Sequence, residues 1–153
     1  MSPAPWRIAD FEAAVGTEIG LSRWLPVPQS RIDAFADVTE DRQFIHVDPA
    51  KAAQSAYGGT VAHGFLTLSL LSTLAYDGLP AIAGATASVN YGFDRIRFIA
   101  PVLSGAQIRA RFRLGDCQRR NDGHLLIRLD VTVEIEGQDR PALTGEWIIL
   151  HLF

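Results

Sequence analysis

Polar and apolar side chains alternate without interruption from Gln107 to Leu114. Glutamine and arginine take the odd-numbered positions, whereas isoleucine, alanine, phenylalanine and leucine take the even-numbered ones. A period of two residues is typical of a β-strand that buries one face and exposes the other to water. The pattern therefore predicts a half-buried strand over these residues.

This strand belongs to the second half of the chain, after about residue 85, where further strand-like segments are separated by turn residues. Asn121-Asp122-Gly123 is a favourable turn sequence, and residues 136–139 form another. The strand-like segments are residues 87–93, 95–99, 107–114, 125–136 and 142–152. Together they predict an antiparallel sheet.

Helical patterns dominate the first half of the chain. Ser30 can cap a short helix that ends near residues 38–39, with Asp33 completing a pattern that resembles a capping box. Asp48 followed by proline predicts the start of a second, brief helix over residues 49–54. The third helix, residues 64–76, is apolar nearly all round, so we expect it to be buried on most sides.

The expected elements have matching dimensions. A helix of about 13 residues is about 20 Å long, and strands of six or seven residues are about 20–23 Å long. A curved antiparallel sheet can therefore wrap around one long apolar helix. We predict a single α+β domain over residues 1–153, in which residues 11–25 fit either an irregular arm or a strand near residues 18–25.

Charge and composition exclude several classes of protein. The formal net charge is −3 and the arginines are scattered among acidic residues, so nucleic-acid binding is not expected. The most apolar run, residues 65–76, is shorter than the about 20 residues of a membrane span. Cys117 is the single cysteine, the N-terminus is polar and proline-rich, and no secretion signal is visible. These features fit a cytoplasmic protein without a disulfide.

Asp41 and His46 form the strongest candidate for chemistry. Five positions rotate about 140° on an α-helix, so the two side chains meet only if a turn lies between them. The expected end of one helix and the start of the next at Asp48 supply that turn. An imidazole titrates near neutral pH, so the pair suits general acid–base catalysis. On spacing alone, capping or structural roles for these residues stay open.

Gly64 opens the apolar helix, where backbone N–H groups have no intrahelical acceptor. Its N–H can donate to an oxygen on which negative charge develops, although a glycine here can also serve only close packing. His46 and Asp48 are not joined by a further cluster of histidines or cysteines, so no metal site is predicted.

Residues 35–52 resemble the hydratase motif of the MaoC-like, R-specific (type 2) enoyl-CoA hydratases. That motif has an aromatic residue, then Asp-x-Asn-Pro-aliphatic-His, and then a small residue. The matching residues here are Phe35, Asp41, Ile45, His46 and Ala52. Ala62-His63-Gly64 resembles the start of the family's central helix, and Asn90-Tyr91-Gly92 with the residues up to Val102 resembles its first core strands.

Two departures from the motif place the chain nearer to the nodulation-protein-N-like branch of the same superfamily. Glu40 stands where the family has glycine, and Gln43-Phe44 replaces Asn-Pro. The resemblance implies a hot-dog fold, in which the antiparallel sheet wraps around a long central helix. It implies that Asp41 and His46 hold a water that adds to a trans-2-enoyl thioester, with either residue as the base.

The resemblance also implies substrate-binding roles and partners. The Gly64 N–H would bind the thioester oxygen, and Ser72 matches a family serine near the catalytic aspartate. A buried hydroxyl bonded to its own helix is an equal alternative for Ser72. The substrate would be an acyl-CoA or acyl-carrier thioester, no cofactor would be needed, and the chain would form a homodimer. An acyl-CoA thioesterase and a non-catalytic acyl-CoA-binding subunit remain alternatives.

Overall fold

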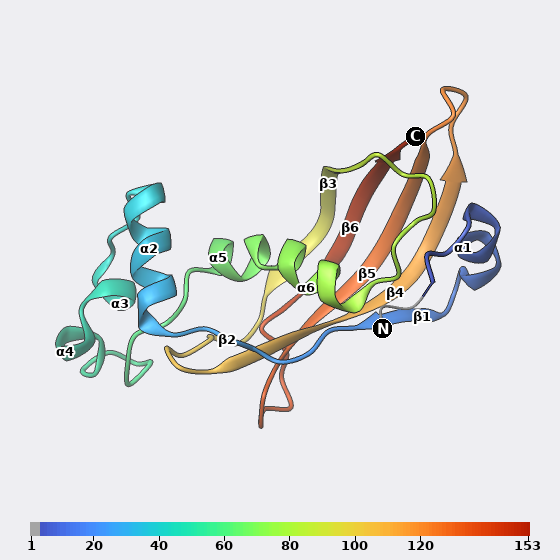
Figure 1. Ribbon diagram of the computed structural model, residues 1–153. Coiled ribbons are helices and arrows are strands. Elements are labelled where there is room, and N and C mark those ends of the chain that lie inside the picture. The colour runs from blue at the N-terminus through green and yellow to red at the C-terminus, as the bar shows by residue number, and fades with distance from the viewer. Residues whose placement is uncertain (1–3) are drawn as a thin grey trace.

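The computed structural model describes residues 4–153 and shows one antiparallel sheet with helices over one face and beyond one end (Figure 1). The strands are β1 (Glu18–Leu21), β2 (Leu25–Pro26), β3 (Ala87–Phe98), β4 (Gln107–Arg119), β5 (Leu125–Ile135) and β6 (Leu143–Leu152). The helices are α1 (Ile8–Ala14), α2 (Gln29–Thr39), α3 (Phe44–Val47), α4 (Pro49–Ala52), α5 (Gly64–Ser69) and α6 (Leu71–Gly78). The spatial order of the strands is β1-β4-β5-β6-β3, and β2 also pairs with β4. The predicted α+β arrangement is confirmed.

The alternating residues of β4 form its two faces, as the sequence predicts. The inward-facing side chains share complete burial, at 0% exposure each: Ile108, Ala110, Phe112 and Leu114. On the opposite face, Arg109 and Arg111 both pair with the Glu134 carboxylate of β5, at 2.6 and 3.0 Å. The inner face of the sheet therefore supplies the core, whereas the outer face is charged.

Residues 87–93 and 95–99, which the sequence predicts as separate strands, form the single strand β3. The register with β6 shifts between Asp94 and Arg97, and Arg95 has a φ of 55° there. A β-bulge of this kind bends a strand without ending its pairing. β3 lies at an edge of the sheet, and most of its side chains are exposed.

The predicted helix of residues 64–76 is present as α5 and α6, which are separated only by Leu70. The Leu70 N–H donates to the Leu66 carbonyl, and the Leu74 N–H donates to the Leu70 carbonyl, so the helical path continues across the break. The two helices lie along the inner face of the sheet (Figure 1). The sheet therefore wraps around a central helix, as predicted.

The expectation that the central helix is buried on most sides is wrong. Leu66, Leu71 and Leu74 are buried in the core, but Phe65 is 67% exposed and Tyr76 is 86% exposed. Positions 65 and 76 are eleven residues apart, which is about three turns, so both lie on one face of the helix. One face of the helix, with these two aromatic side chains at its ends, is thus left uncovered by this chain.

The N-terminal part corrects two details of the sequence analysis. Residues 11–25, which were open between an arm and a strand, contain the end of α1 and all of β1. Ser30 is not the N-cap, because α2 begins one residue earlier, directly after the extended backbone of Pro28. Asp33 accepts a hydrogen bond from the Gln29 side chain instead of completing a capping box.

The predicted cap at Asp48 is confirmed, because its carboxylate accepts from the Lys51 N–H at 3.0 Å. Among residues 4–153, no helix is both long enough and apolar enough to cross a membrane.

Candidate active site

Residues 40–63, called here the connecting segment, join α2 to α5 and carry α3 and α4. α3 lies beside α2 and α4 lies beside α3, both beyond the end of the sheet (Figure 1). The segment begins at Glu40, which ends α2 with a left-handed φ of 62°. Glycine adopts this conformation freely, whereas other residues are disfavoured by about 1 kcal/mol or more. The hydratase motif has glycine here, so Glu40 keeps the backbone turn that the family glycine favours.

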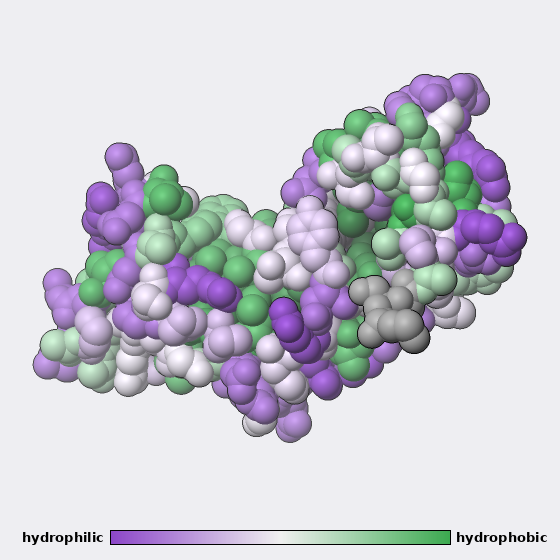
Figure 2. All heavy atoms as spheres, in the orientation of Figure 1, coloured by the Kyte–Doolittle hydropathy of each residue, from purple (hydrophilic) through white to green (hydrophobic). Residues whose placement is uncertain are grey.

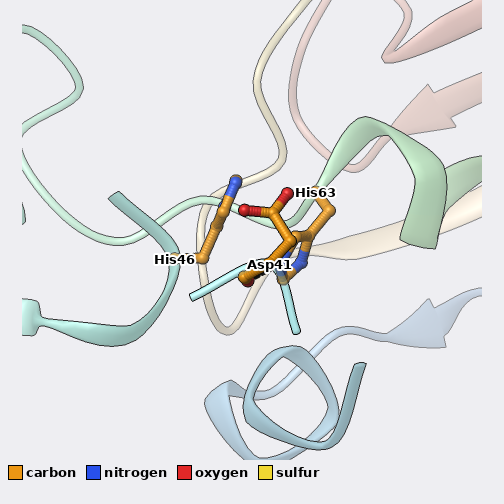
Figure 3. A group of neighbouring side chains, drawn as sticks. All are labelled: Asp41, His46 and His63. Atoms are coloured by element: carbon orange, nitrogen blue, oxygen red, sulfur yellow. Dashed lines mark hydrogen bonds between the residues drawn. The ribbon is translucent and has the colours of Figure 1, made fainter. Parts of the chain in front are cut away.

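Asp41, His46 and His63 form a compact cluster at this segment (Figure 3). A carboxylate oxygen of Asp41 and one ring nitrogen of each histidine all lie within 4.8 Å of one another. His46 is 7% exposed and His63 is 2% exposed, while Asp41 is open to solvent. The turn therefore brings Asp41 and His46 together, and the start of the central helix adds His63.

A backbone contact determines which nitrogen of His46 is available. Nδ1 of His46 lies 2.7 Å from the carbonyl oxygen of Val61. A carbonyl oxygen can only accept, so Nδ1 carries the proton and donates it in this bond. In the neutral ring, Nε2 is therefore the unprotonated nitrogen, and it has a lone pair that can accept a proton.

His63 is the residue of the cluster that the sequence analysis did not single out as functional. Its Nε2 lies 2.9 Å from the Asp41 carbonyl oxygen, and therefore donates to it. Its ring stacks on that of His46, with centroids 3.8 Å apart and planes at 23°. Its Nδ1 is buried without a hydrogen-bond partner in the described part of the chain. The signals in the sequence were its place next to Gly64, at the predicted start of a helix, and the resemblance of Ala62-His63-Gly64 to the family's segment there.

Gln29, at the start of α2, holds the connecting segment from outside. Its side-chain N–H donates to the backbone oxygen of His46 at 2.7 Å, and its side-chain oxygen accepts from the Thr60 hydroxyl. One side chain thus links α2 to two distant points of the segment. Sequence patterns give no indication of such a bond, because its partners are 17 and 31 residues away.

A cleft of about 370 Å³ opens beside the cluster, and its wall includes His46 and Gly64. Gly64 is the first residue of α5, so its N–H has no acceptor within the helix. A Cβ atom at this position would come within 3.0 Å of the Phe98 ring, so the glycine also permits close packing. Both interpretations of Gly64 from the sequence are compatible with this geometry. Thr67, one turn later and 3% exposed, lines the same cleft.

Ser72 lies apart from this group within the chain. It lines a second cavity, of about 470 Å³, between α6, residues 79–86 and strands β3 and β6. None of the cluster residues belongs to the wall of that cavity. A single chain thus brings together Asp41, His46 and Gly64, but not Ser72.

The cluster has the donor types of a metal site but not the geometry. A metal ion lies in the plane of each imidazole that binds it, at about 2.1 Å from the nitrogen. The rings of His46 and His63 are stacked 3.8 Å apart, so their planes meet only far from both rings. Each ring also has one nitrogen committed to a backbone carbonyl. The group is better suited to holding a water molecule than a metal ion.

Comparisons with known proteins identify the structural class to which this fold and site belong. The solved structure of the (R)-hydratase from A. caviae superimposes with a TM-score of 0.69 at 27% identity, covering 88% of this chain and 96% of that one. The sheet wrapped around a central helix is thus the hot-dog fold that the sequence resemblance implied.

A family model described as MaoC like domain matches residues 10–135, and the chain therefore belongs to the MaoC-like family. Nodulation protein N of Rhizobium leguminosarum bv. viciae is 51% identical over 147 residues, which cover 95% of this chain and 91% of that protein. The 3-hydroxyacyl-thioester dehydratase Z of Mycobacterium tuberculosis is 39% identical over 145 residues, covering 95% of each. The resemblance to the MaoC-like hydratases and to their nodulation-protein-N-like branch is confirmed.

Proposed function

We propose that the chain adds water to trans-2-enoyl thioesters to give (R)-3-hydroxyacyl thioesters, or removes it in reverse, with Asp41 and His46 as the catalytic pair. The proposal rests on the distance between the two side chains. A water that bonds two groups at about 2.8 Å each, at a tetrahedral angle, spans about 4.6 Å between them. An Asp41 carboxylate oxygen and one ring nitrogen of His46 lie no more than 4.8 Å apart, a range that includes this separation. The names of the dehydratase and hydratase relatives support the same reaction class.

His46 acts as the base in this scheme, because Nε2 has the free lone pair. The water oxygen bonds to C3 of the substrate as one water proton moves to His46 Nε2. The electrons of the C2–C3 double bond shift toward the thioester oxygen. The proton held by the pair then bonds to C2, which completes the addition of H and OH. The Asp41 carboxylate orients the water and stabilises the imidazolium that forms in between.

Gly64 would stabilise the negative charge that develops on the thioester oxygen. Its N–H is free of an intrahelical acceptor, and it opens onto the cleft that His46 lines. A donor aimed at such an oxyanion is worth about 3–4 kcal/mol in enzymes where one was removed. No cofactor is required by these steps, and coenzyme A or a carrier protein would serve as the handle of the substrate.

We further propose a homodimer that pairs the β3 strands of two copies. β3 is an edge strand of 12 residues, and a long exposed edge is a template for pairing with another chain. Large apolar side chains are exposed along it and on the adjoining stripe of the central helix: Val89, Tyr91, Phe98, Phe65 and Tyr76. The Phe65 and Phe98 rings are in contact, at 6.1 Å between centroids, so helix and strand form one surface.

This dimer would bring Ser72 to the catalytic pair of the other copy. Antiparallel pairing of two identical strands about their midpoint sets residues 87–90 of one copy beside residues 95–98 of the other. Residues 87–90 border the Ser72 cavity, whereas Phe98 borders the His46 cleft. Each active site would then combine Asp41, His46 and Gly64 of one chain with the partner's Ser72 and its cavity for the acyl chain.

Hydration of crotonyl-CoA tests the proposed reaction. Addition of water removes the enoyl absorbance while the thioester stays intact, and we expect the (R)-3-hydroxy product. Release of free thiol without loss of the enoyl group would favour the thioesterase alternative. Binding of the thioester without either change would favour the acyl-CoA-binding subunit.

Mixed dimers test the shared site. Asp41→Asn removes the catalytic carboxylate, and Ser72→Trp fills the cavity, so we expect each variant alone to be inactive. When the two are mixed and allowed to exchange, one site per mixed dimer has an intact pair and an intact cavity, and activity should return. A mixture that stays inactive although both variants melt as the wild type does would contradict the shared site.

A further inference from the structure

His63 contacts both members of the catalytic pair but not the cleft beside them. Its Nε2–H donates to the backbone oxygen of Asp41 at 2.9 Å, and its ring lies against that of His46, with centroids 3.8 Å apart. The side chain is 2% exposed and does not belong to the wall of the cleft that His46 and Gly64 line. Any effect of His63 on catalysis must therefore pass through Asp41 and His46.

The Asp41 side chain has little else to fix its position. It is open to solvent, and the one hydrogen bond that its carboxylate makes within residues 4–153 is a long one, 3.5 Å from the Gln43 N–H. Within the same residues, the Asp41 backbone oxygen accepts a hydrogen bond from His63 alone. The position of the carboxylate thus depends on the backbone at this turn, and the His63 N–H holds that backbone.

The ring of His46 also needs a second contact. Its hydrogen bond to the Val61 carbonyl fixes Nδ1, which is one atom of the ring, but does not fix the tilt of the ring plane. The stacked ring of His63, inclined by only 23°, limits that tilt because tilting would press the two ring faces together. Nε2 of His46 is then held in one direction.

The chemistry of the His63 ring argues against a packing role alone. Its Nδ1 is buried without a hydrogen-bond partner in the described part of the chain, whereas Nε2 makes the bond to Asp41. A buried polar atom without a partner is unfavourable, and a phenyl ring would fill the same space without one. Phe35 packs against His63, at 5.0 Å between centroids, so the surroundings suit an apolar ring. The N–H that a phenyl ring lacks explains why an imidazole stands here.

We propose that His63 is the positioning residue of the pair: its N–H holds the Asp41 backbone, and its ring face holds the plane of the His46 ring. The inference rests on the proposed function, since it names how the two groups of that site are kept in place. A water shared by two groups needs both at hydrogen-bond distance, and a displacement of about 1 Å at either one would break one of its bonds.

Three variants at this position separate the two contacts. His63→Gln keeps an N–H donor but has no ring, His63→Phe keeps a ring but has no donor, and His63→Leu has neither. We expect kcat for crotonyl-CoA hydration to fall about tenfold in each of the first two and about a hundredfold in His63→Leu, the cost of a displacement of about 1 Å. KM should stay near the wild-type value, because His63 does not line the cleft.

Leu74→Val is the matched control for stability. Leu74 is buried to the same extent, at 2% exposure, on the same central helix, but it lines neither cavity. This variant should lower the melting temperature and keep the wild-type kcat. A loss of kcat in His63→Leu no larger than in Leu74→Val would overturn the proposal, as would a loss of kcat/KM that comes entirely from KM. If His63→Leu does not fold, the same criteria apply to His63→Gln and His63→Phe.

A measurement without substrate separates this proposal from the proposed reaction. The Nδ1 proton of His46, which bonds to the Val61 oxygen, should give a downfield NMR resonance that is identified by its loss in His46→Gln. We expect this resonance to persist in His63→Phe and to broaden in His63→Gln and His63→Leu, where no ring holds His46. That pattern supports the positioning role even if crotonyl-CoA is not hydrated. An unchanged resonance in all three variants refutes it even if crotonyl-CoA is hydrated.

Discussion

The sheet and the connecting segment hold their side chains in place by different means. β4 and β5 pair over most of their length with one register shift after Leu114, and a buried row from Leu125 to Ile135 alternates with positions that are mostly half-buried. The connecting segment has only two four-residue helices, and a few backbone bonds and the contacts of Gln29, His46 and His63 hold it in place. Figure 2 shows the surface hollowed between the side of the molecule with α2 and the side with the sheet ends.

Because of this difference, the sheet should mainly determine stability, whereas the connecting segment should mainly determine catalytic turnover. Losing one core side chain of the sheet removes packing around many neighbours, whereas losing one contact in the segment moves a catalytic atom without exposing much apolar surface. Variants in the segment should therefore affect turnover more than melting, and variants in the sheet should do the reverse.

The catalytic pair should show the largest effect. His46→Gln removes the base and Asp41→Asn removes the charge that stabilises the imidazolium, and each should lower kcat by about 10²–10⁴-fold. Steady-state hydration of crotonyl-CoA measures the loss, and thermal melting of Asp41→Asn should be close to the wild type because Asp41 is exposed. Near-wild-type turnover in both variants would remove the catalytic assignment.

Among variants of the sheet, Phe112→Ala should cause the largest loss of stability. Phe112 is fully buried in β4, and truncation of such a side chain costs about 3–5 kcal/mol of unfolding free energy. Denaturant unfolding measures this change. Val38→Ala, at a side chain that is 81% exposed on α2, is the comparison and should unfold at nearly the wild-type midpoint. Equal losses in the two variants would mean that the core does not lie on the inner face of the sheet.

The sequence predicts the sheet better than the site because the two depend on different ranges of interaction. Alternation along β4 and β5 is a local pattern, so the strands and their faces can be read from it. The bulge at Arg95 was taken for a break, because a bulge and a turn interrupt the alternation in the same way. The exposed stripe with Phe65 and Tyr76 was taken as buried, because an apolar side chain looks the same whether its own chain or another one covers it.

The sequence predicted site residues only where they belong to a recognisable motif. Asp41 and His46 were found through their spacing and the turn before Asp48, and the structure brings them together. His63 and Gln29 were missed as functional residues because their contacts join segments that are 17 or more residues apart. Ser72 was expected near Asp41, and its place in the second cavity makes that contact a prediction about the dimer.

His151 should make the stability of the sheet depend on pH. The unfolded ring binds a proton near pH 6.5, but the folded ring does so only near pH 4. Its contribution is therefore complete above pH 6.5 and is lost as the pH falls toward 4, by about 2 kcal/mol. Urea unfolding at several pH values should show a steeper decline for the wild type than for His151→Asn. Parallel curves would show that the ring is protonated in the fold as readily as in the unfolded chain.

Gln29→Leu should have the smallest of these effects. It removes the N–H that holds the His46 backbone, and a small displacement of the base should lower kcat about tenfold. The melting temperature should change little, because Gln29 is only half-buried. Gln54→Leu, an exposed position of the same segment, serves as the control and should keep full turnover. If both variants lose turnover alike, the bond to His46 is not what holds the base in place.

The addition of a water to C3 is tested most directly by running the reaction in oxygen-18 water. Crotonyl-CoA treated with the wild-type protein should yield a 3-hydroxy thioester that carries the label on C3, with the bond to sulfur unbroken, and His46→Gln should yield almost none. Label found instead in the carboxylate of a released acid would show that the water attacks the thioester carbon, and would contradict a hydratase.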